Sequence, residues 1–157
     1  MLSIHLDCAT DSETLMTGTE PYTRFSKSLS VSHEQAALFA EMAGDSNPIH
    51  HDADHAKALG FEDLTLSGAQ STSLLMGLIA DYFSRVGPMV GLEFEIFFKN
   101  PTIAEKPLDL EWLIVRNTAK PKINAQLVEL RGRLKIAGRE TAVGAKGKVL
   151  VYNQTLN

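Results

Sequence analysis

A carboxylate and an imidazole stand five residues apart in the segment 43–52, AGDSNPIHHD, just after the expected end of a helix. Asp45 and His50 can converge on one point if the chain between them turns. Asn47-Pro48 favours such a turn, because the residue before a proline avoids the helical region. A convergent pair can hold one water molecule and move its protons, which is general acid–base chemistry near neutral pH. On the spacing alone, the plainer interpretation is a helix stop, a surface turn and a solvated histidine, because such loops are common.

The same stretch holds four potential metal ligands: His50, His51, Asp54 and His55. His51 and His55 would lie one turn apart if they share a short helix, as paired ligands often do. No cysteine lies nearby and the spacing fits no fixed zinc pattern. We therefore interpret these side chains as a solvated face and expect no metal site.

The elements around this loop can be read from caps and periodicity. A strand is expected over about 22–31, followed by a helix that Ser32 caps and Gly44 ends. The predicted buried side of this helix consists of Phe39, Ala40, Met42 and Ala43. A second, short helix is expected to begin after Asp52 and to stop at Gly60.

A long helix is the strongest periodic signal, running from near Gly68 to before Gly87-Pro88. Its opposite face also carries Met76, Gly77 and Ala80, so the helix is apolar nearly all round and is predicted to be buried.

Beyond this helix the apolar residues alternate, in four runs centred on 92–98, 108–114, 128–136 and 143–151. Alternation with charged residues predicts half-buried strands, and their short connections predict an antiparallel meander with one solvent-exposed face. The apolar face of the sheet would cover the long helix. This is an α+β single domain of the hot-dog type, with an antiparallel sheet wrapped around a central helix.

The segment Asp45-Ser46-Asn47-Pro48-Ile49-His50, with the helix before it and the long helix and strands after it, resembles the hydratase-2 signature of the MaoC-like, (R)-specific enoyl-CoA hydratase family. The resemblance runs from about Gly18 to Val151. It implies a homodimeric hot-dog enzyme that reversibly hydrates trans-2-enoyl-CoA to the (3R)-hydroxyacyl thioester. It also implies that Asp45 and His50 are catalytic, that Asn47 braces the loop, and that the thioester carbonyl meets the helix start at Gly68.

The chain departs from the family pattern at two places. Ser67 stands where the family usually has histidine before the glycine, which affects the substrate side of the pocket. In the segment 101–106, Glu105-Lys106 replaces the usual Gly-Asp turn, which we expect to affect only the local backbone.

Composition sets broader limits. With 157 residues, 44% hydrophobic and 22% charged, the chain has room for one domain, predicted at 21–152 after a lead-in at 1–20. The net charge of −4 does not favour binding to nucleic acid, which requires a basic surface. No segment has the pattern of a secretory signal or of a membrane span. Cys8 is the single cysteine, so no intrachain disulfide can form and a cytoplasmic location is expected.

The sequence thus predicts a lyase of fatty acid metabolism, an acyl-thioester hydratase or dehydratase acting on CoA or acyl-carrier-protein substrates. No cofactor is expected, because the reaction only moves protons and water.

Two alternatives stay open. One is a binding module that kept the fold and lost efficient turnover, which Ser67 would suit. The other is a hot-dog thioesterase that uses Glu62 or Asp63, neighbours of the long helix, as its carboxylate. Most basic residues in the last strands are expected on the solvent-exposed face of the sheet, although a few could bind the phosphates of CoA.

Overall fold

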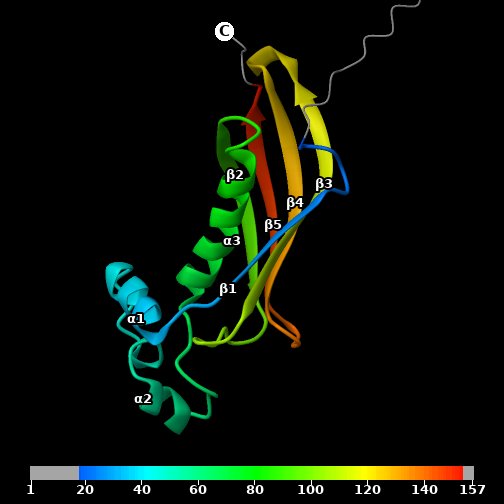
Figure 1. The fold of residues 1–157 in the computed structure, drawn as a ribbon. Helices are drawn as coiled ribbons and strands as arrows, with labels where there is room; N and C mark the ends of the chain where they lie inside the picture. Colours follow the sequence, from blue (N-terminus) through cyan, green and yellow to red (C-terminus); the bar gives the residue numbers. More distant parts are fainter. Residues whose placement is uncertain (1–17, 154–157) are drawn as a thin grey trace, which may run out of the picture.

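A computed structural model describes residues 18–153 as one antiparallel sheet with a long helix against it (Figure 1). The strands are β1 (Arg24–Leu29), β2 (Met89–Phe98), β3 (Leu108–Lys120), β4 (Ala125–Ile136) and β5 (Thr141–Tyr152). The helices are α1 (His33–Met42), α2 (Ala53–Ala58) and α3 (Gly68–Phe83), with 3-10 turns η1 (Pro48–His50) and η2 (Pro121–Ile123). The predicted α+β hot-dog architecture is confirmed.

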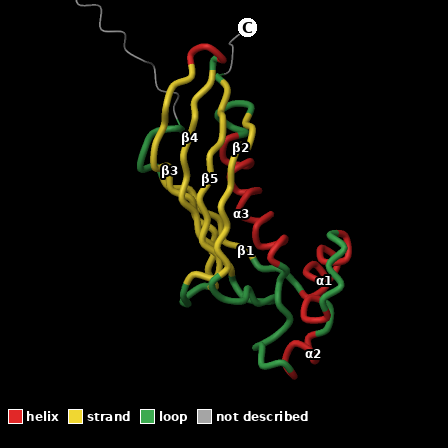
Figure 2. The backbone as a smooth tube through the Cα atoms, turned by 180° about the vertical axis from the view of Figure 1, so that it is seen from behind, coloured by secondary structure: helices red, strands yellow, loops and turns green. Residues whose placement is uncertain are grey.

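The strand order in the sheet is β1-β3-β4-β5-β2. Only β3, β4 and β5 form a meander, so the prediction of a meander through all four late strands was wrong. β2 instead pairs with β5 at the far edge, and β1 occupies the place beside β3. The reason is the connection 99–107, which carries the chain across the end of the sheet from the edge strand β2 to β3, the neighbour of the other edge strand (Figure 2).

The core lies between α3 and one face of the sheet. Leu75, Ile79 and Phe83 of α3 are fully buried, and Trp112 of β3 donates a hydrogen bond from its indole Nε1 to the Leu75 carbonyl at 2.9 Å. Gly132, opposite Trp112 on β4, leaves room for the indole, because a Cβ there would lie 2.5 Å from the ring. The helix is therefore fixed to the sheet by packing and by one buried hydrogen bond.

The prediction that α3 is buried all round was wrong for the described chain. Met76, Gly77 and Ala80 are exposed, because the five strands cover only one side of the helix. The uncovered side adjoins the edge strand β2, where Val90 and Leu92 are also about half exposed.

The two short helices are separate from the sheet and carry the polar loop between them (Figure 1). Ser32 and Gln35 form the expected capping box of α1, and Asp52 caps α2. The predicted buried side of α1 was wrong in part: Ala36 and Ala40 are its buried residues, whereas Met42 is 81% exposed and Ala43 is exposed as well. The predicted lead-in at 1–20 lies almost wholly outside the described residues. No helix among residues 18–153 is long and apolar enough to cross a bilayer.

Candidate active site

Asp45 owes its position to the way in which α1 ends. The Gly44 amide bonds the Glu41 carbonyl at 3.0 Å and the Asp45 amide bonds the Ala40 carbonyl at 2.8 Å, which is the Schellman pattern. Gly44 adopts a φ of +73°, which glycine tolerates without strain. The carboxylate therefore leaves the helix at a fixed angle.

The Asp45 loop is held by its own polar groups. One oxygen of Asp45, Oδ1, accepts the Asn47 amide at 3.1 Å, and the Asn47 side chain accepts the Ile49 amide at 3.4 Å at the start of η1. The His51 ring contacts the Asp45 carbonyl oxygen through Nε2 at 2.6 Å. The bracing role expected of Asn47 matches this geometry. The contact made by His51, which the sequence presented only as a possible metal ligand, was not predicted.

His50 is the buried member of the pair, with 7% of its surface exposed. Its Nδ1 lies 2.8 Å from the Thr65 carbonyl oxygen and 3.1 Å from the Thr65 hydroxyl, which itself donates to the Ile49 carbonyl at 3.3 Å. A carbonyl can only accept, so Nδ1 carries the proton. In the neutral ring Nε2 then presents a free lone pair. Nothing in the sequence pattern marked Thr65 as the group that sets this tautomer.

Nε2 of His50 faces the second oxygen of Asp45, Oδ2, at 3.5 Å. This exceeds the ~2.7–3.2 Å of a direct N–H···O hydrogen bond. Two acceptors so close repel each other unless a proton donor lies against both. A water molecule supplies such donors, and the Asp45 side chain is 36% exposed, so solvent can reach the pair. The predicted convergence of the two groups is therefore present.

A pocket of about 320 Å³ connects His50 to the start of α3. Its lining includes His50, Thr65, Gly68, Ser71 and Phe98. The first backbone N–H groups of α3 open here, where the helix dipole favours negative charge. A Cβ at Gly68 would lie 3.0 Å from the Phe98 ring, so glycine lets this ring pack close to the start of α3. Asp45 does not line this pocket but borders an adjacent hollow with Pro48 and His51.

Ser67 has a structural partner. It is fully buried, and its hydroxyl caps α3 by accepting the Gln70 amide at 3.1 Å. Its side chain is not part of the pocket lining. The substitution of the family's usual histidine thus coincides with a conventional N-cap, and the substrate-binding role expected of Ser67 stays a prediction.

The second departure falls on a strained residue. Glu105 has a φ of +58°, a left-handed conformation in which glycine would be free of strain. Its carboxylate accepts the His33 amide at 2.9 Å and its own amide bonds the Val31 carbonyl at 2.8 Å, which helps offset the strain. As expected, the effect is one of local backbone shape.

The two carboxylates considered for a thioesterase are held by cations. Glu62 is bound by Arg139 and by Lys106, and these hydrogen bonds lower its pKa to about 2. The pKa of Asp63 is also lowered, by the Leu64 amide and then by Lys57. Both groups are weakened as bases.

The dense His and Asp segment does not form a metal cluster in the described part of the chain. Among residues 18–153, no three His, Cys, Asp or Glu side chains lie close enough together to hold an ion. His50 and His51 instead bond to carbonyl oxygens of Thr65 and Asp45.

A family model described as the MaoC-like domain matches residues 16–129, which include Asp45, His50 and Gly68. The chain belongs to the MaoC-like family. A curated relative, the mitochondrial 3-hydroxyacyl-[acyl-carrier-protein] dehydratase FERN of Solanum lycopersicum, is 27% identical over 108 residues. That match covers 67% of this chain and 65% of the tomato protein, slightly under two thirds of its length.

Solved structures of MaoC-like proteins share the fold. The (R)-hydratase of A. caviae aligns with a TM-score of 0.73 at 22% identity, covering 88% of this chain and 98% of that one. The R-hydratase PhaJ1 of Pseudomonas aeruginosa aligns with a TM-score of 0.71 at 21% identity, covering 86% and 83%. The HadBC (3R)-hydroxyacyl-ACP dehydratase of Mycobacterium tuberculosis gives 0.70 at 20% identity, covering 87% and 99%. By their names, these relatives are (R)-hydratases and 3-hydroxyacyl-[acyl-carrier-protein] dehydratases.

Proposed function

We propose that this MaoC-like protein catalyses the reversible hydration of a trans-2-enoyl thioester to the (3R)-hydroxyacyl thioester, with Asp45 and His50 sharing the reacting water. The observation that carries the proposal is the contact between His50 and Thr65, which leaves the Nε2 lone pair facing Asp45. Family membership supports the reaction class, and CoA and carrier-protein thioesters are both compatible with it.

The geometry suits each step of an addition across the double bond. Asp45 orients the water, and Nε2 of His50 takes a proton as the water oxygen bonds to C3 of the enoyl group. The negative charge moves to the thioester oxygen, which the N–H groups around Gly68 stabilise. The proton on His50 then passes to C2, which returns the pair to its starting state. The net change is addition of one H and one OH, and dehydration follows the same steps in reverse.

The thioesterase alternative is less well supported by the site. Glu62 forms ion pairs with Lys106 and Arg139, and a carboxylate whose pKa is about 2 is a poor base near neutral pH. Release of free thiol from acyl-CoA, measured with a thiol reagent, would identify a thioesterase and would contradict the hydratase proposal.

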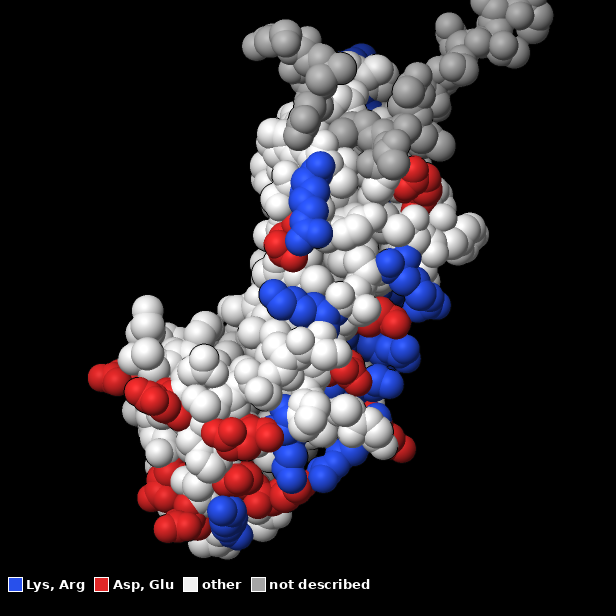
Figure 3. All heavy atoms as spheres, in the orientation of Figure 1, with Lys and Arg blue, Asp and Glu red and all other residues white. Residues whose placement is uncertain are grey.

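A homodimer through the β2 edge is part of the same proposal. One side of β2 has no neighbouring strand among the described residues. Val90, Leu92 and Phe97 on it are 45–53% exposed, and Met76 on α3 is 38% exposed. Asp81 is the one charged residue within α3 and pairs with Arg85 at 3.3 Å, whereas acidic residues gather on the lobe formed by α1 and α2 (Figure 3). An unpaired apolar edge of this kind favours self-association by strand pairing.

Sedimentation velocity tests the dimer. Leu92→Glu should shift the protein from dimer to monomer, because the new charge would be buried in the interface. Leu59→Glu is the matched control, since Leu59 is 61% exposed at the end of α2, away from the edge. A wild type that sediments as a monomer would contradict this part of the proposal. The expected cytoplasmic location stays a prediction.

The reaction itself is tested by following the ultraviolet absorbance of the conjugated enoyl thioester with crotonyl-CoA and longer trans-2-enoyl-CoAs. Loss of the absorbance and formation of the 3-hydroxyacyl product are expected. An unchanged absorbance with every enoyl thioester, whether on CoA or on a carrier protein, would favour the binding-module alternative.

A further inference from the structure

A basic hollow adjoins the pocket of the proposed reaction. It has a volume of about 670 Å³ and lies where β4 turns into β5. Four cations line it, Lys99, Arg133, Lys135 and Arg139, together with one carboxylate, Glu140. Lys99 and its neighbour Asn100 also line the pocket that contains His50 and Gly68. The two cavities therefore share a wall just after the end of β2.

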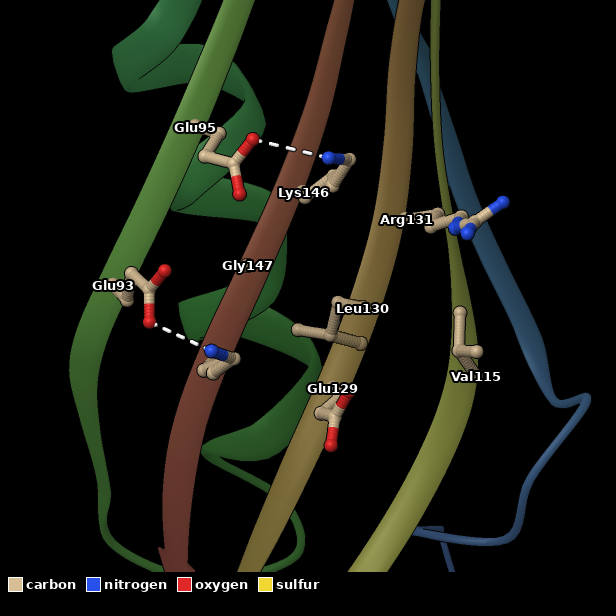
Figure 4. Close-up of a pocket in the computed structure, with 9 residues that line it drawn as sticks. Glu93, Glu95, Val115, Glu129, Leu130, Arg131, Lys146 and Gly147 are labelled. Carbon is tan, nitrogen blue, oxygen red and sulfur yellow. Dashed lines mark hydrogen bonds and ion pairs between the residues drawn. The ribbon is translucent and has the colours of Figure 1, made fainter.

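Most cations on the outer face of the sheet are already neutralised. Lys146 bonds Glu95 at 3.0 Å and Lys148 bonds Glu93 at 2.8 Å, as the cross-strand pairs of Figure 4 show. Within the hollow, Arg133 pairs with Glu111 at 3.1 Å.

Two lysines in the hollow differ from these paired cations. Across residues 18–153, no carboxylate lies within ion-pair distance of Lys99 or Lys135. Asp109, opposite Lys135 in the register, instead accepts the Ser28 hydroxyl at 2.7 Å. The hollow thus retains two ammonium groups without an ion pair in the described part of the chain, although Glu140 also lines it.

The backbone explains why the cations gather there. Gly144 has no side chain, and the Lys99 Cε would lie 3.7 Å from a Cβ built at that position, so the Lys99 side chain runs across β5 on the outer face. Gly144 pairs with Arg133 on β4, and Thr141 pairs with Lys135. Lys99 is thereby directed toward both β4 cations.

We infer that Lys99 and Lys135, flanked by Arg133, bind the phosphate at the far end of the thioester's pantetheine arm. The inference rests on the proposed function for the identity of the arm. An acyl group bound between His50 and Gly68 would leave its arm to run out along the wall that Lys99 and Asn100 form between the pocket and the basic hollow. Ammonium groups form strong charge-assisted hydrogen bonds with phosphate oxygens. CoA and the phosphopantetheine group of a carrier protein both carry this phosphate, so the inference applies to either form of the substrate.

Binding of saturated thioesters tests the site without turnover, because a butyryl group has no double bond to hydrate. Isothermal titration calorimetry of the full chain would use butyryl-CoA, butyryl-phosphopantetheine and butyryl-pantetheine. The double variant Lys99→Ala/Lys135→Ala should weaken binding of both phosphate-bearing thioesters by about tenfold or more. Binding of butyryl-pantetheine should change by less than about twofold. Lys120→Ala/Lys122→Ala is the matched control, since these lysines lie at the opposite end of β3.

Butyryl-CoA and butyryl-phosphopantetheine together distinguish a contact with the shared phosphate from a contact with the nucleotide of CoA. An equal loss for both assigns the lysines to the shared phosphate and supports the inference. A loss confined to butyryl-CoA would move the contact to the nucleotide and overturn it, as would equal behaviour of the double variant and its control. A wild-type protein that binds in this lysine-dependent way but hydrates no enoyl thioester would refute the proposed reaction and leave the phosphate site standing.

Discussion

The ring of His50 is anchored to the backbone of Thr65, with Nδ1 2.8 Å from the carbonyl oxygen. Thr65 lies 15 residues further along the chain and just before Ser67, the cap of α3, so this contact connects the Asp45–His50 loop to the start of the central helix. This one contact fixes both the orientation of the imidazole and the nitrogen that is free to accept a proton.

The first prediction concerns which ring nitrogen of His50 carries the proton. Heteronuclear NMR of ¹⁵N-histidine-labelled protein should show that the neutral His50 ring carries its proton on Nδ1, because the Thr65 carbonyl can only accept. His55→Gln provides the control for assignment, since His55 is exposed on α2. A proton found on Nε2 would contradict the assigned roles.

Gly44→Ala tests the helix end that positions Asp45. A Cβ at a φ of +73° is strained, so the free energy of unfolding in urea should fall by about 1 kcal/mol. Gly44→Asn should lose less, because asparagine adopts the left-handed conformation more readily. Equal stability of wild type and Gly44→Ala would show that the Schellman geometry is not maintained in solution.

Local rules anticipated much of the fold and of the site. Caps and periodicity located α1, α2 and α3, because these signals act within a few residues. The strand order was not predictable in the same way: β2 and β5 pair across about fifty residues, and alternation is the same for either neighbour. The exposure of one side of α3 could not be predicted from the sequence either. An apolar helix face has the same composition whether its own chain or a second chain covers it.

Within the site, the signature indicated Asp45, His50 and the bracing Asn47, but not the other supporting residues. Thr65, His51 and Phe98 act through tertiary contacts, and residues of these types have no distinctive spacing in the chain. The same holds for Lys99, which is one of many lysines until the sheet brings it to Gly144.

Gly68→Ala tests the approach to the start of α3. The added methyl group would narrow the pocket between Gly68 and Phe98, where the proposal places the thioester carbonyl, so hydration should slow by about 10²-fold. Stability should change little, because Phe98 is 60% exposed and its ring can move aside. Adding Phe98→Ala should not restore the rate. Recovery in the double variant would assign the defect to the displaced ring instead.

Glu62 makes stability depend on acid. Its pKa is lowered from 4.5 to about 2 by Arg139 and Lys106, so the folded state binds its proton less readily than the unfolded chain. The contribution is present above pH 4.5 and is lost as the pH falls toward about 2. Glu62→Gln should flatten the dependence of unfolding free energy on pH in this window. Glu34→Gln, an exposed change on α1, should leave the slope as in wild type, and an unchanged slope in Glu62→Gln would refute the ion-pair account.

The most direct test of the central claim compares steady-state hydration of crotonyl-CoA by wild type, Asp45→Asn and His50→Ala. Each change should lower kcat by about 10²–10⁴-fold, because each removes a proton-transfer or water-orienting group, while circular dichroism shows that the fold is kept. Asp54→Asn and His55→Ala, exposed positions of the same types on α2, should retain wild-type rates. Folded Asp45→Asn or His50→Ala variants that hydrate crotonyl-CoA as fast as wild type would contradict the account.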